Sequence, residues 1–435
     1  MTDVRLRFAG GIGFTAKILS LFTGLAFTML ITRNLSIIEF GQWGLINSIL
    51  VYGAFPVSLL GYWYSRYTAR GTQIARSGIL ISFLFIGIGL VIFFIAGYSF
   101  LDKYESLLPI ILFASLQVPT SSLVLVLSEI ANGRKPEYSS YAFLCFEIVK
   151  VSIAFIVVFM RGISLLDAII IVTIAEVIQV IVLSLLLRNE IAKSVNFGNI
   201  KKILKALWVP FFTQITGIVY SSDVLIVSLV TTMITHISFF KAGIVFASII
   251  SYGGYLAYPI YIKLISGGKK EDVTISTKLM LTFTIPLTVG IFILAEPLLF
   301  LLNIQYVSAK YILQILVFFY LTVAIKSMLV NVILGTEKLD SIESKADFKK
   351  MLFSSHMKIP IIGIIDTGIY ILILSVFAYI SLNYDMPSET FGQIWASILL
   401  ASSIPITLIY VKMAKKRIMF EFPWKNISVH IFVAF

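Results

Sequence analysis

The chain has 435 residues, of which 59% are hydrophobic and only 13% are charged, and its mean hydropathy is +0.98. Soluble domains carry about 25% charged residues, so this sequence has about half the charge that solvates a globular surface. Apolar runs of about 20 residues recur along it, the length at which an α-helix crosses a hydrocarbon core about 30 Å thick. The sequence therefore predicts an all-α polytopic membrane protein. The same long runs exclude a transmembrane β-barrel, whose strands alternate over about 10 residues.

The net charge of +12 does not by itself indicate a nucleic-acid partner. Basic residues of a membrane protein collect in its cytoplasmic loops, and this accounts for the excess, so we expect no nucleic acid to bind. The single cysteine, Cys145, lies inside an apolar run. One cysteine cannot form an intrachain disulfide, so it carries no information on redox compartment.

Twelve apolar runs are long enough to be transmembrane helices, and short polar loops separate them. The longest loop, 335–358, is charged and has room for at most a surface helix, so no segment can hold a soluble catalytic domain. We therefore predict that the protein is not an enzyme. The predicted spans are 8–33, 43–65, 77–100, 107–131, 138–160, 164–187, 207–231, 238–262, 279–302, 308–334, 359–382 and 390–411.

Prolines within or at the edges of these spans predict kinks, because proline removes a helical hydrogen bond. Kinked helices are common in transporters that alternate between two openings, and also in membrane proteins generally. These prolines are Pro56, Pro119, Pro210, Pro259, Pro286 and Pro405.

Lysine and arginine asymmetry predicts the orientation. With the N-terminus inside and the spans alternating, 26 of the 34 basic residues fall in inside segments and only Arg33, Lys103, Arg161 and Lys310 fall outside. A misplaced span would scramble the alternation after it. We therefore predict a multi-pass protein of the cell membrane with a cytoplasmic N-terminus.

The basic connection 191–206 divides the spans into six and six. We predict an N-terminal six-helix bundle at 1–190 and a C-terminal six-helix bundle at 207–412. A tail at 413–435 turns apolar again without completing a span, which predicts either the start of a missing thirteenth helix or a surface-lying amphipathic tail.

A weak sequence similarity between the two halves indicates how they are related. LITRNLSIIEFG (30–41) and MITHISFFKAG (233–243) both leave the first helix of a half and lead into the second. If the two are related, the halves are parallel repeats about an axis along the membrane normal, with a cavity between them near the midplane.

Four lysines fall inside predicted spans, where an ionisable group costs about 2.5–3.5 kcal/mol on insertion scales and usually faces a protein interior or a wet cavity. Lys17 and Lys326 lie deepest, about 14 and 12 Å from the nearer span end at 1.5 Å per residue. Lys150 follows Glu147 by three residues, so a local neutralising pair competes with a role in a cavity. Lys241, near the start of its span, is also placed to snorkel outward. We predict these four as candidate cavity cations that bind substrate.

Acidic side chains in the spans are candidates for ion coupling or for balancing the lysines. Glu176 lies in mid-span, with Gln179 one turn on as a candidate hydrogen-bond partner. Asp223 and Asp366 lie about eight and seven residues from the nearer span ends, and Glu147 accompanies its lysine.

The sequence lacks the motifs that would indicate a metal cluster or a nucleotide-phosphate site. His236, His356 and His430 are scattered, which predicts no metal cluster. No GxxxxGK[ST] motif exists to cradle phosphates, and GGKKED (267–272) follows a helix in a basic loop, where a solvated turn is the simpler interpretation. We expect no cofactor.

Three segments resemble the prokaryotic oligosaccharide flippases. LITRNLSIIEFGQWGLINSIL (30–50) is similar to that family's junction between helices 1 and 2, with Thr-Arg, a polar turn, Glu39-Phe40-Gly41 and an aromatic at Trp43. We expect Asn34 to Phe40 to form the turn and the second helix to resume at Gly41. ALWVPFFTQITGIVYSSDVLIV (206–227) resembles the family's helix 7, and SEIANGRKPEYSSYAF (128–143) its turn from helix 4 into helix 5.

The resemblance implies a lipid-linked oligosaccharide exporter of the polysaccharide-transport branch of the multidrug/oligosaccharidyl-lipid/polysaccharide exporter superfamily. Members surround a central cavity with two six-helix bundles and move a polyprenyl-phosphate or diphosphate-linked sugar across by alternating access, for surface glycan assembly. Fourteen spans are common in the family, which implies that a fourteenth helix is missing along with the thirteenth. Partners implied are membrane lipids, Na⁺ or H⁺, and glycosyltransferases or a polymerase of the same pathway.

Two rival classes compete with this one, and a third, a channel or scaffold, has no specific support in the sequence. A multidrug exporter of the same superfamily, driven by Na⁺ or H⁺, favours deep acids over deep lysines, and both occur here. A membrane glycosyltransferase or polymerase needs a large external loop or loop acids, whereas the predicted external loops have about ten residues or fewer.

Overall fold

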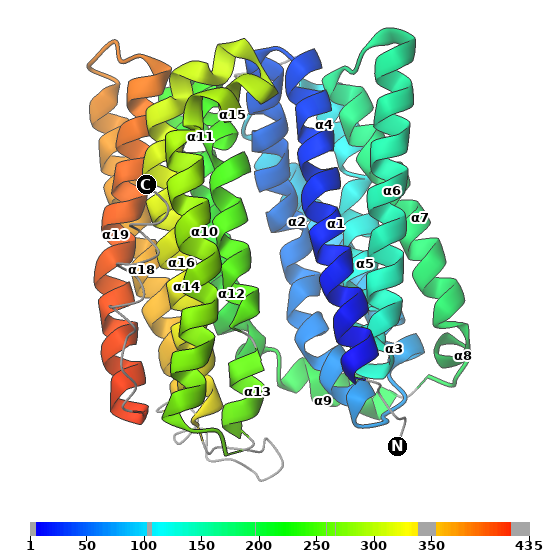
Figure 1. The fold of residues 1–435 in the computed structure, drawn as a ribbon. Coiled ribbons are helices and arrows are strands. Elements are labelled where there is room, and N and C mark those ends of the chain that lie inside the picture. The colour runs from blue at the N-terminus through cyan, green and yellow to red at the C-terminus, as the bar shows by residue number, and fades with distance from the viewer. Residues whose placement is uncertain are drawn as a thin grey trace. The chain divides into compact units, whose positions relative to one another are not determined.

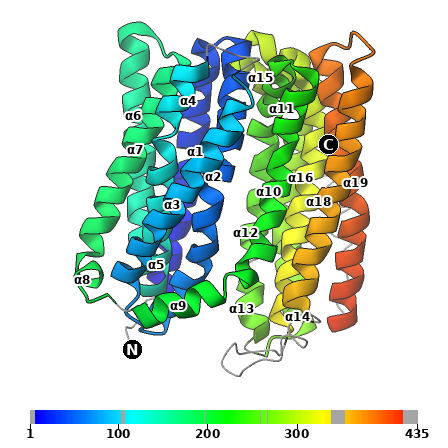
Figure 2. The same cartoon turned by 180° about the vertical axis from the view of Figure 1, so that it is seen from behind.

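The computed structural model describes residues 6–101, 107–195, 197–257, 259–265, 267–337 and 354–418. Within these ranges the regular structure is helical, and no strand occurs (Figure 1). The chain divides into two compact units, Met1–Ile234 (unit 1) and Thr235–Phe435 (unit 2). Figure 2 shows the same ribbon from behind.

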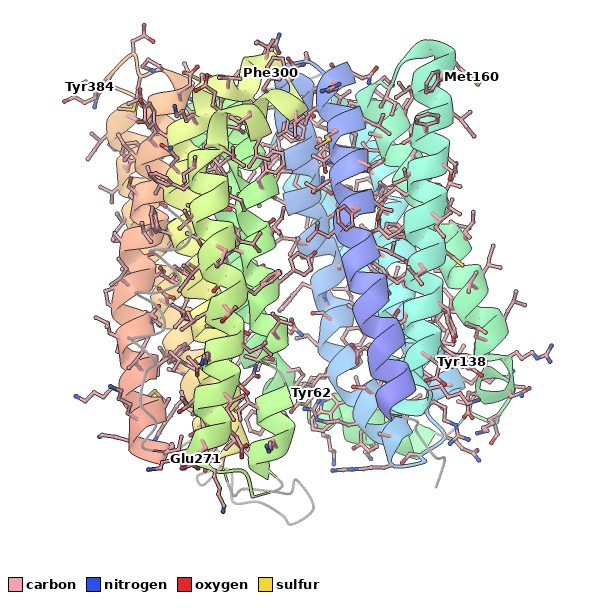
Figure 3. The ribbon with its side chains drawn as sticks, in the orientation of Figure 1. Tyr62, Tyr138, Met160, Glu271, Phe300 and Tyr384 are labelled. Atoms are coloured by element: carbon pink, nitrogen blue, oxygen red, sulfur yellow. The ribbon has the colours of Figure 1, made fainter. Side chains whose placement is uncertain are left out.

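Unit 1 consists of long helices and three short helices of nine residues or fewer. In unit 1, Tyr62 and Tyr138 lie at the end opposite to Met160, as expected for helices that alternate in direction (Figure 3). Its helices are α1 (Leu6–Asn34), α2 (Ile37–Ala69), α3 (Ala75–Tyr98), α4 (Leu108–Ala114), α5 (Gln117–Arg134), α6 (Pro136–Arg161), α7 (Leu165–Leu186), α8 (Arg188–Ile191), α9 (Phe197–Lys205) and α10 (Trp208–Thr231).

Unit 2 is also built from long helices, one of which is interrupted. Glu271 lies at one end of the unit, and Phe300 and Tyr384 lie at the other. Its elements are α11 (Ile234–Ala247, which begins at the boundary), η2 (Ser248–Tyr252), α12 (Gly253–Leu256), α13 (Pro259–Ile265), α14 (Lys270–Ile293), α15 (Ala295–Leu302), η3 (Ile304–Ala309), α16 (Lys310–Gly335), α18 (Ser355–Ser381) and α19 (Ser388–Arg417).

The helices confirm the predicted fold class. Eleven helical segments in the described part of the chain are long and apolar enough to cross a membrane. The remaining predicted span, 8–33, lies on α1, a helix of 29 residues. The chain is therefore an all-helical, multi-pass membrane protein. The division at 191–206, the central cavity and the orientation stay predictions, and residues 419–435 of the tail lie outside the described residues.

Three predicted spans are not single helices, among them 279–302, which divides between α14 and α15 at Leu294. The span 107–131 breaks between α4 and α5, because Pro119 lies in the first turn of α5 and has no N–H to donate back across the break. The span 238–262 divides into α11, η2, α12 and α13, and Pro259 begins α13. By contrast, Pro56, Pro286 and Pro405 lie inside the continuous helices α2, α14 and α19.

Two helices begin earlier than expected because acidic residues cap them. α14 starts at Lys270 rather than at 279, and Asp272 accepts a hydrogen bond from the backbone N–H of Lys269 at 2.9 Å. α2 starts at Ile37, so the expectation that it resumes at Gly41 is wrong. Ser36 Oγ accepts from the Glu39 N–H at 3.2 Å, and the Glu39 carboxylate accepts from the Ser36 N–H at 2.9 Å. This is a capping box, and it gives Glu39 of the Glu-Phe-Gly motif a structural role.

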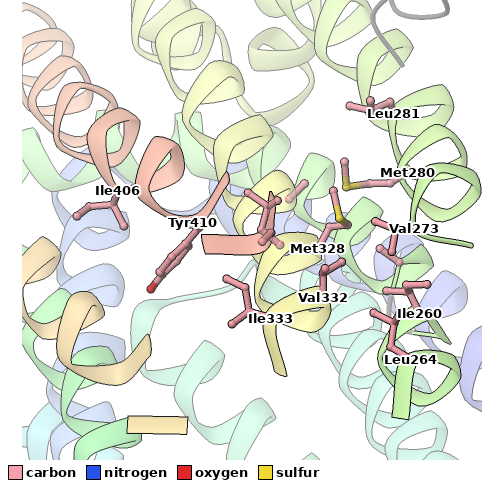
Figure 4. Close-up of a cluster of buried hydrophobic side chains, with 14 of the residues drawn as sticks. Ile260, Leu264, Val273, Met280, Leu281, Met328, Val332, Ile333, Ile406 and Tyr410 are labelled. Carbon is pink, nitrogen blue, oxygen red and sulfur yellow. The ribbon is translucent and has the colours of Figure 1, made fainter. Parts of the chain in front are cut away.

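Buried apolar clusters hold the helices of each unit together. In unit 2, side chains from α13, α14, α16 and α19 meet in one cluster, which includes Met280, Met328, Val332 and Tyr410 (Figure 4). In unit 1, a second cluster joins α2, α3, α5, α6 and α7 around Trp63 and Tyr64.

Helices α2 and α3 approach closely at two glycines. A Cβ placed on Gly89 would overlap the carbonyl oxygen of Gly53, and one placed on Gly53 would press against Val118 and Phe93. Small residues at a helix crossing let backbones come near enough for dispersion contacts, which replace the hydrophobic drive that is absent between helices in lipid.

Gly89→Ala is expected to lower the free energy of unfolding by about 1–3 kcal/mol, because the backbones must separate to admit the methyl group. Thermal unfolding of the detergent-solubilised protein measures this. Gly87→Ala is the matched control, since nothing lies within 4 Å of its Cβ position on the same helix. Equal melting temperatures for the two variants would contradict the close approach of α2 and α3.

Candidate functional site

Unit 1 holds a buried ion pair on α6. Lys150 Nζ lies 3.0 Å from Glu147 Oε1 and 2.9 Å from Oε2, one turn apart along the helix. Thr23 of α1 donates its hydroxyl to Glu147 Oε2 at 2.6 Å. The side chains of Lys150 and Glu147 are only 10% and 7% exposed. The carboxylate is thus held from two helices at once.

Two aromatic rings also lie near the Lys150 ammonium. The rings of Phe146 and Phe27 lie 4.7 and 5.2 Å from Nζ, within cation–π range. Phe27 in turn packs edge-on against Trp43, the aromatic of the 30–50 motif, at 6.4 Å between centroids. The Lys150–Glu147 pair is therefore well satisfied in place, the condition under which buried charges are tolerated.

Unit 2 holds a second ion pair, which joins two helices. Lys326 Nζ of α16 lies 3.5 Å from Asp366 Oδ2 of α18, and the side chains are 18% and 16% exposed. Lys326 is nine residues before the end of α16 and Asp366 eleven residues after the start of α18, depths of about 14 and 16 Å at 1.5 Å per residue.

Polar contacts join the end of α16 to the start of α18 and the end of α19, so these three helix ends lie close together. Glu337, just after α16, accepts from the Ser355 N–H at 3.2 Å and from Arg417 of α19 at 2.9 Å. The two charges of the Lys326–Asp366 pair therefore lie at similar depth, beside the apolar cluster that contains Met328.

Glu176 of α7 has a hydroxyl partner instead of a cation. Thr120 of α5 donates a short hydrogen bond to Glu176 Oε2. The expectation that Gln179 bonds to Glu176 is therefore not met; Gln179 lies three residues on along α7 and is buried. Among the described residues Glu176 makes no ion pair.

The other predicted site residues are not part of these two ion pairs. Asp223 is buried in α10, accepts from the Val224 N–H at 2.7 Å and has a further interaction. Lys241 is the eighth residue of α11, half-buried, and engages a neighbouring group. Lys17 lies in α1, and its side chain is outside the described residues.

The structure shows the predicted pair of Lys150 with Glu147, and it also brings together Lys326 and Asp366, which the sequence indicated only as separate buried charges. Sequence reasoning missed the hydroxyl partners Thr23 and Thr120, because they lie 124 and 56 residues from the acids they bind. It named His236 only as a scattered histidine and did not predict its contacts: the ring stacks on Phe391 at 4.2 Å, and Nδ1 lies 2.9 Å from Ser388 Oγ. In the described part of the chain no three His, Cys, Asp or Glu side chains form a metal-binding group.

Solved structures place this arrangement of helices among known folds. The chain is similar to an inward-facing multidrug resistance MATE family transporter of the MOP superfamily, with TM-score 0.65, 13% identity, and 91% of this chain and 95% of that chain covered. It is similar to the lipid II flippase MurJ in an inward closed conformation, with TM-score 0.63, 14% identity, and 98% and 90% covered. The chain has the fold of the MOP-superfamily transporters.

Other comparisons agree in fold and leave the subfamily open. An outward-facing MATE family transporter matches with TM-score 0.60 and 15% identity over 98% of this chain and 95% of that chain. No protein-family model matches the sequence, and no curated protein matches it. The MOP fold therefore stands on the structure, while the resemblance to the oligosaccharide flippases stays a prediction.

Glu147→Gln is expected to lower the free energy of unfolding by about 3–5 kcal/mol, because it leaves the Lys150 ammonium buried without its counter-ion. Glu296→Gln is the matched control. Glu296 pairs with Lys310 at 3.1 Å, but its side chain is 57% exposed, and exposed pairs contribute about 0–1 kcal/mol. Thermal melting of both variants in the same detergent measures the difference, and equal losses would show that the α6 pair is not held away from solvent.

Proposed function

We propose that the protein is a flippase that moves a polyprenyl-phosphate- or diphosphate-linked oligosaccharide across the cell membrane by alternating access, for surface glycan assembly. The fold supports this class, since one of the similar structures is described as a lipid II flippase. In this account the N-terminus is cytoplasmic, and the halves at 1–190 and 207–412, joined by 191–206, move about a central cavity. The protein performs no catalysis and works with the glycosyltransferases or polymerase of its pathway.

Lys326 is the observation that carries the proposal. Its backbone lies about 14 Å along α16 from the end of the helix, and a phosphate headgroup crossing a low-dielectric core needs such a cation. Lys17, Lys150 and Lys241 are the further candidates for this role.

A cation-coupled multidrug exporter of the same superfamily is the second candidate. Glu176 favours it, because a partly buried carboxyl that makes no ion pair among the described residues suits a cationic drug or a coupling ion such as Na⁺ or H⁺. Asp223 is a further candidate for this coupling. MATE family multidrug transporters are also among the similar structures.

Deleting the protein from its host separates the two candidates. A flippase leaves lipid-linked oligosaccharide stranded on the cytoplasmic leaflet and removes the surface glycan, which glycan staining and leaflet-selective enzymatic labelling measure. Intact surface glycan together with raised drug sensitivity would contradict the flippase and support the exporter.

Lys326→Ala and Lys17→Ala are each expected to abolish lipid-linked glycan export without loss of folded protein, because each removes a cation that the headgroup requires. Complementation of the deletion strain, with membrane abundance checked by immunoblot, measures this. Export at the wild-type level by both single variants would show that the headgroup does not need these two lysines.

A further inference from the structure

The two buried ion pairs differ in how well their charges are satisfied. In unit 1 the Glu147 carboxylate accepts from Lys150 at 2.9–3.0 Å and from Thr23 at 2.6 Å, and two rings cover the ammonium. In unit 2 the Lys326 ammonium, which has three N–H donors, has one carboxylate contact at 3.5 Å and one ring, Phe319, at 6.0 Å among the described residues.

Asp366 is as poorly satisfied as its partner. A carboxylate has about four lone-pair positions, and among the described residues Asp366 uses one of them, on an ammonium 3.5 Å away. A buried ion pair repays its desolvation only when its remaining donors and acceptors are also satisfied. The Lys326–Asp366 pair therefore keeps most of its capacity to bind something else.

We propose that Asp366 is an internal counter-ion that competes with the substrate's phosphate groups for Lys326, so that the headgroup enters by replacing the Asp366 carboxylate on the Lys326 ammonium. This proposal rests on the proposed flippase function and adds a regulated, exchangeable anion site to it. The Lys150–Glu147 pair has more contacts and therefore exchanges less readily than the Lys326–Asp366 pair.

The geometry favours exchange at Lys326 over Lys150. Lys326 and Asp366 lie on different helices, α16 and α18, so the pair can open by a small shift of one helix or a rotamer change. Glu147 cannot leave Lys150 without also leaving Thr23 of α1, since both partners hold it. The Lys326–Asp366 pair is also less enclosed, 18% and 16% exposed against 10% and 7%.

An internal counter-ion also solves a problem that a lone lysine poses. An unpaired ammonium about 14 Å inside a span is costly when no substrate is bound. With Asp366 beside it, the empty site is close to neutral, and a diphosphate, with more charge and more acceptor oxygens than a carboxylate, can displace it.

The test is binding of a soluble isoprenoid diphosphate, farnesyl diphosphate, to the full chain in nanodiscs of zwitterionic lipid, with farnesol as the neutral control. Asp366→Asn removes the competitor and is expected to tighten farnesyl diphosphate binding about tenfold, the factor that corresponds to one charge-assisted hydrogen bond. Lys326→Gln should weaken binding, and Lys326→Gln combined with Asp366→Asn should bind no tighter than Lys326→Gln alone.

Asp366→Glu keeps the negative charge, so it still tests the proposal if Asp366→Asn fails to fold. The extra methylene group brings the carboxylate closer to the Lys326 ammonium than the present 3.5 Å. The internal pair is then stronger, so farnesyl diphosphate is expected to bind severalfold more weakly. Glu296→Gln, at the exposed pair with Lys310 in the same unit, should leave the affinity unchanged.

Two results would overturn the proposal, and they are distinguishable. Binding of farnesyl diphosphate to the wild type that Asp366→Asn does not tighten, or that Asp366→Glu does not weaken, refutes the counter-ion while leaving the flippase intact. Absence of diphosphate binding by the wild type and by Asp366→Asn alike refutes both.

Discussion

A charge inside a membrane span needs a partner, and this constraint shapes the polar interior of both units. Lipid offers no water to an ammonium or a carboxylate, so each such group is paired, hydrogen-bonded or brought to the surface. The protein meets the constraint in three ways: within one helix at Lys150 and Glu147, between helices at Lys326 and Asp366, and through a hydroxyl at Glu176 and Thr120.

These three solutions are not equivalent for function. The contacts around Glu147 tie α1 to α6 and stabilise unit 1. The contact between Lys326 and Asp366 is long, and it is the one ion pair that either group makes among the described residues, so we propose that it can be remade with a different anion. Both kinds of pair keep the resting span close to neutral. Under the proposed function, this combination keeps the scaffold rigid while the binding groups exchange partners.

Span length and hydropathy predicted the membrane helices well, because a helix that faces lipid must be long and apolar whatever it packs against. The breaks were less predictable. Pro119 marks the start of α5, but Pro56 lies inside a continuous helix, so proline alone does not tell a break from a kink. The early start of α2 had a readable signal, since Ser36 and Glu39 have capping-box spacing.

Whether an ion pair could be predicted from the sequence depended on how far apart its partners lie along the chain. Glu147 and Lys150 are three residues apart, and helix geometry predicts that they meet. Lys326 and Asp366 are forty residues apart on separate helices, and each could be named as a buried charge without its partner being known. Thr23 and Thr120 carry no signal in the sequence, because a threonine in a span most often bonds to its own helix.

Transport in proteoliposomes tests the central claim most directly. A fluorescent polyprenyl-diphosphate oligosaccharide is placed in one leaflet, and its arrival in the other is followed with an impermeant glycosidase, for the wild type and for Lys326→Ala. The account predicts protein-dependent translocation that Lys326→Ala abolishes. Translocation that survives this substitution, or movement of cationic drugs in place of the lipid-linked sugar, would contradict it.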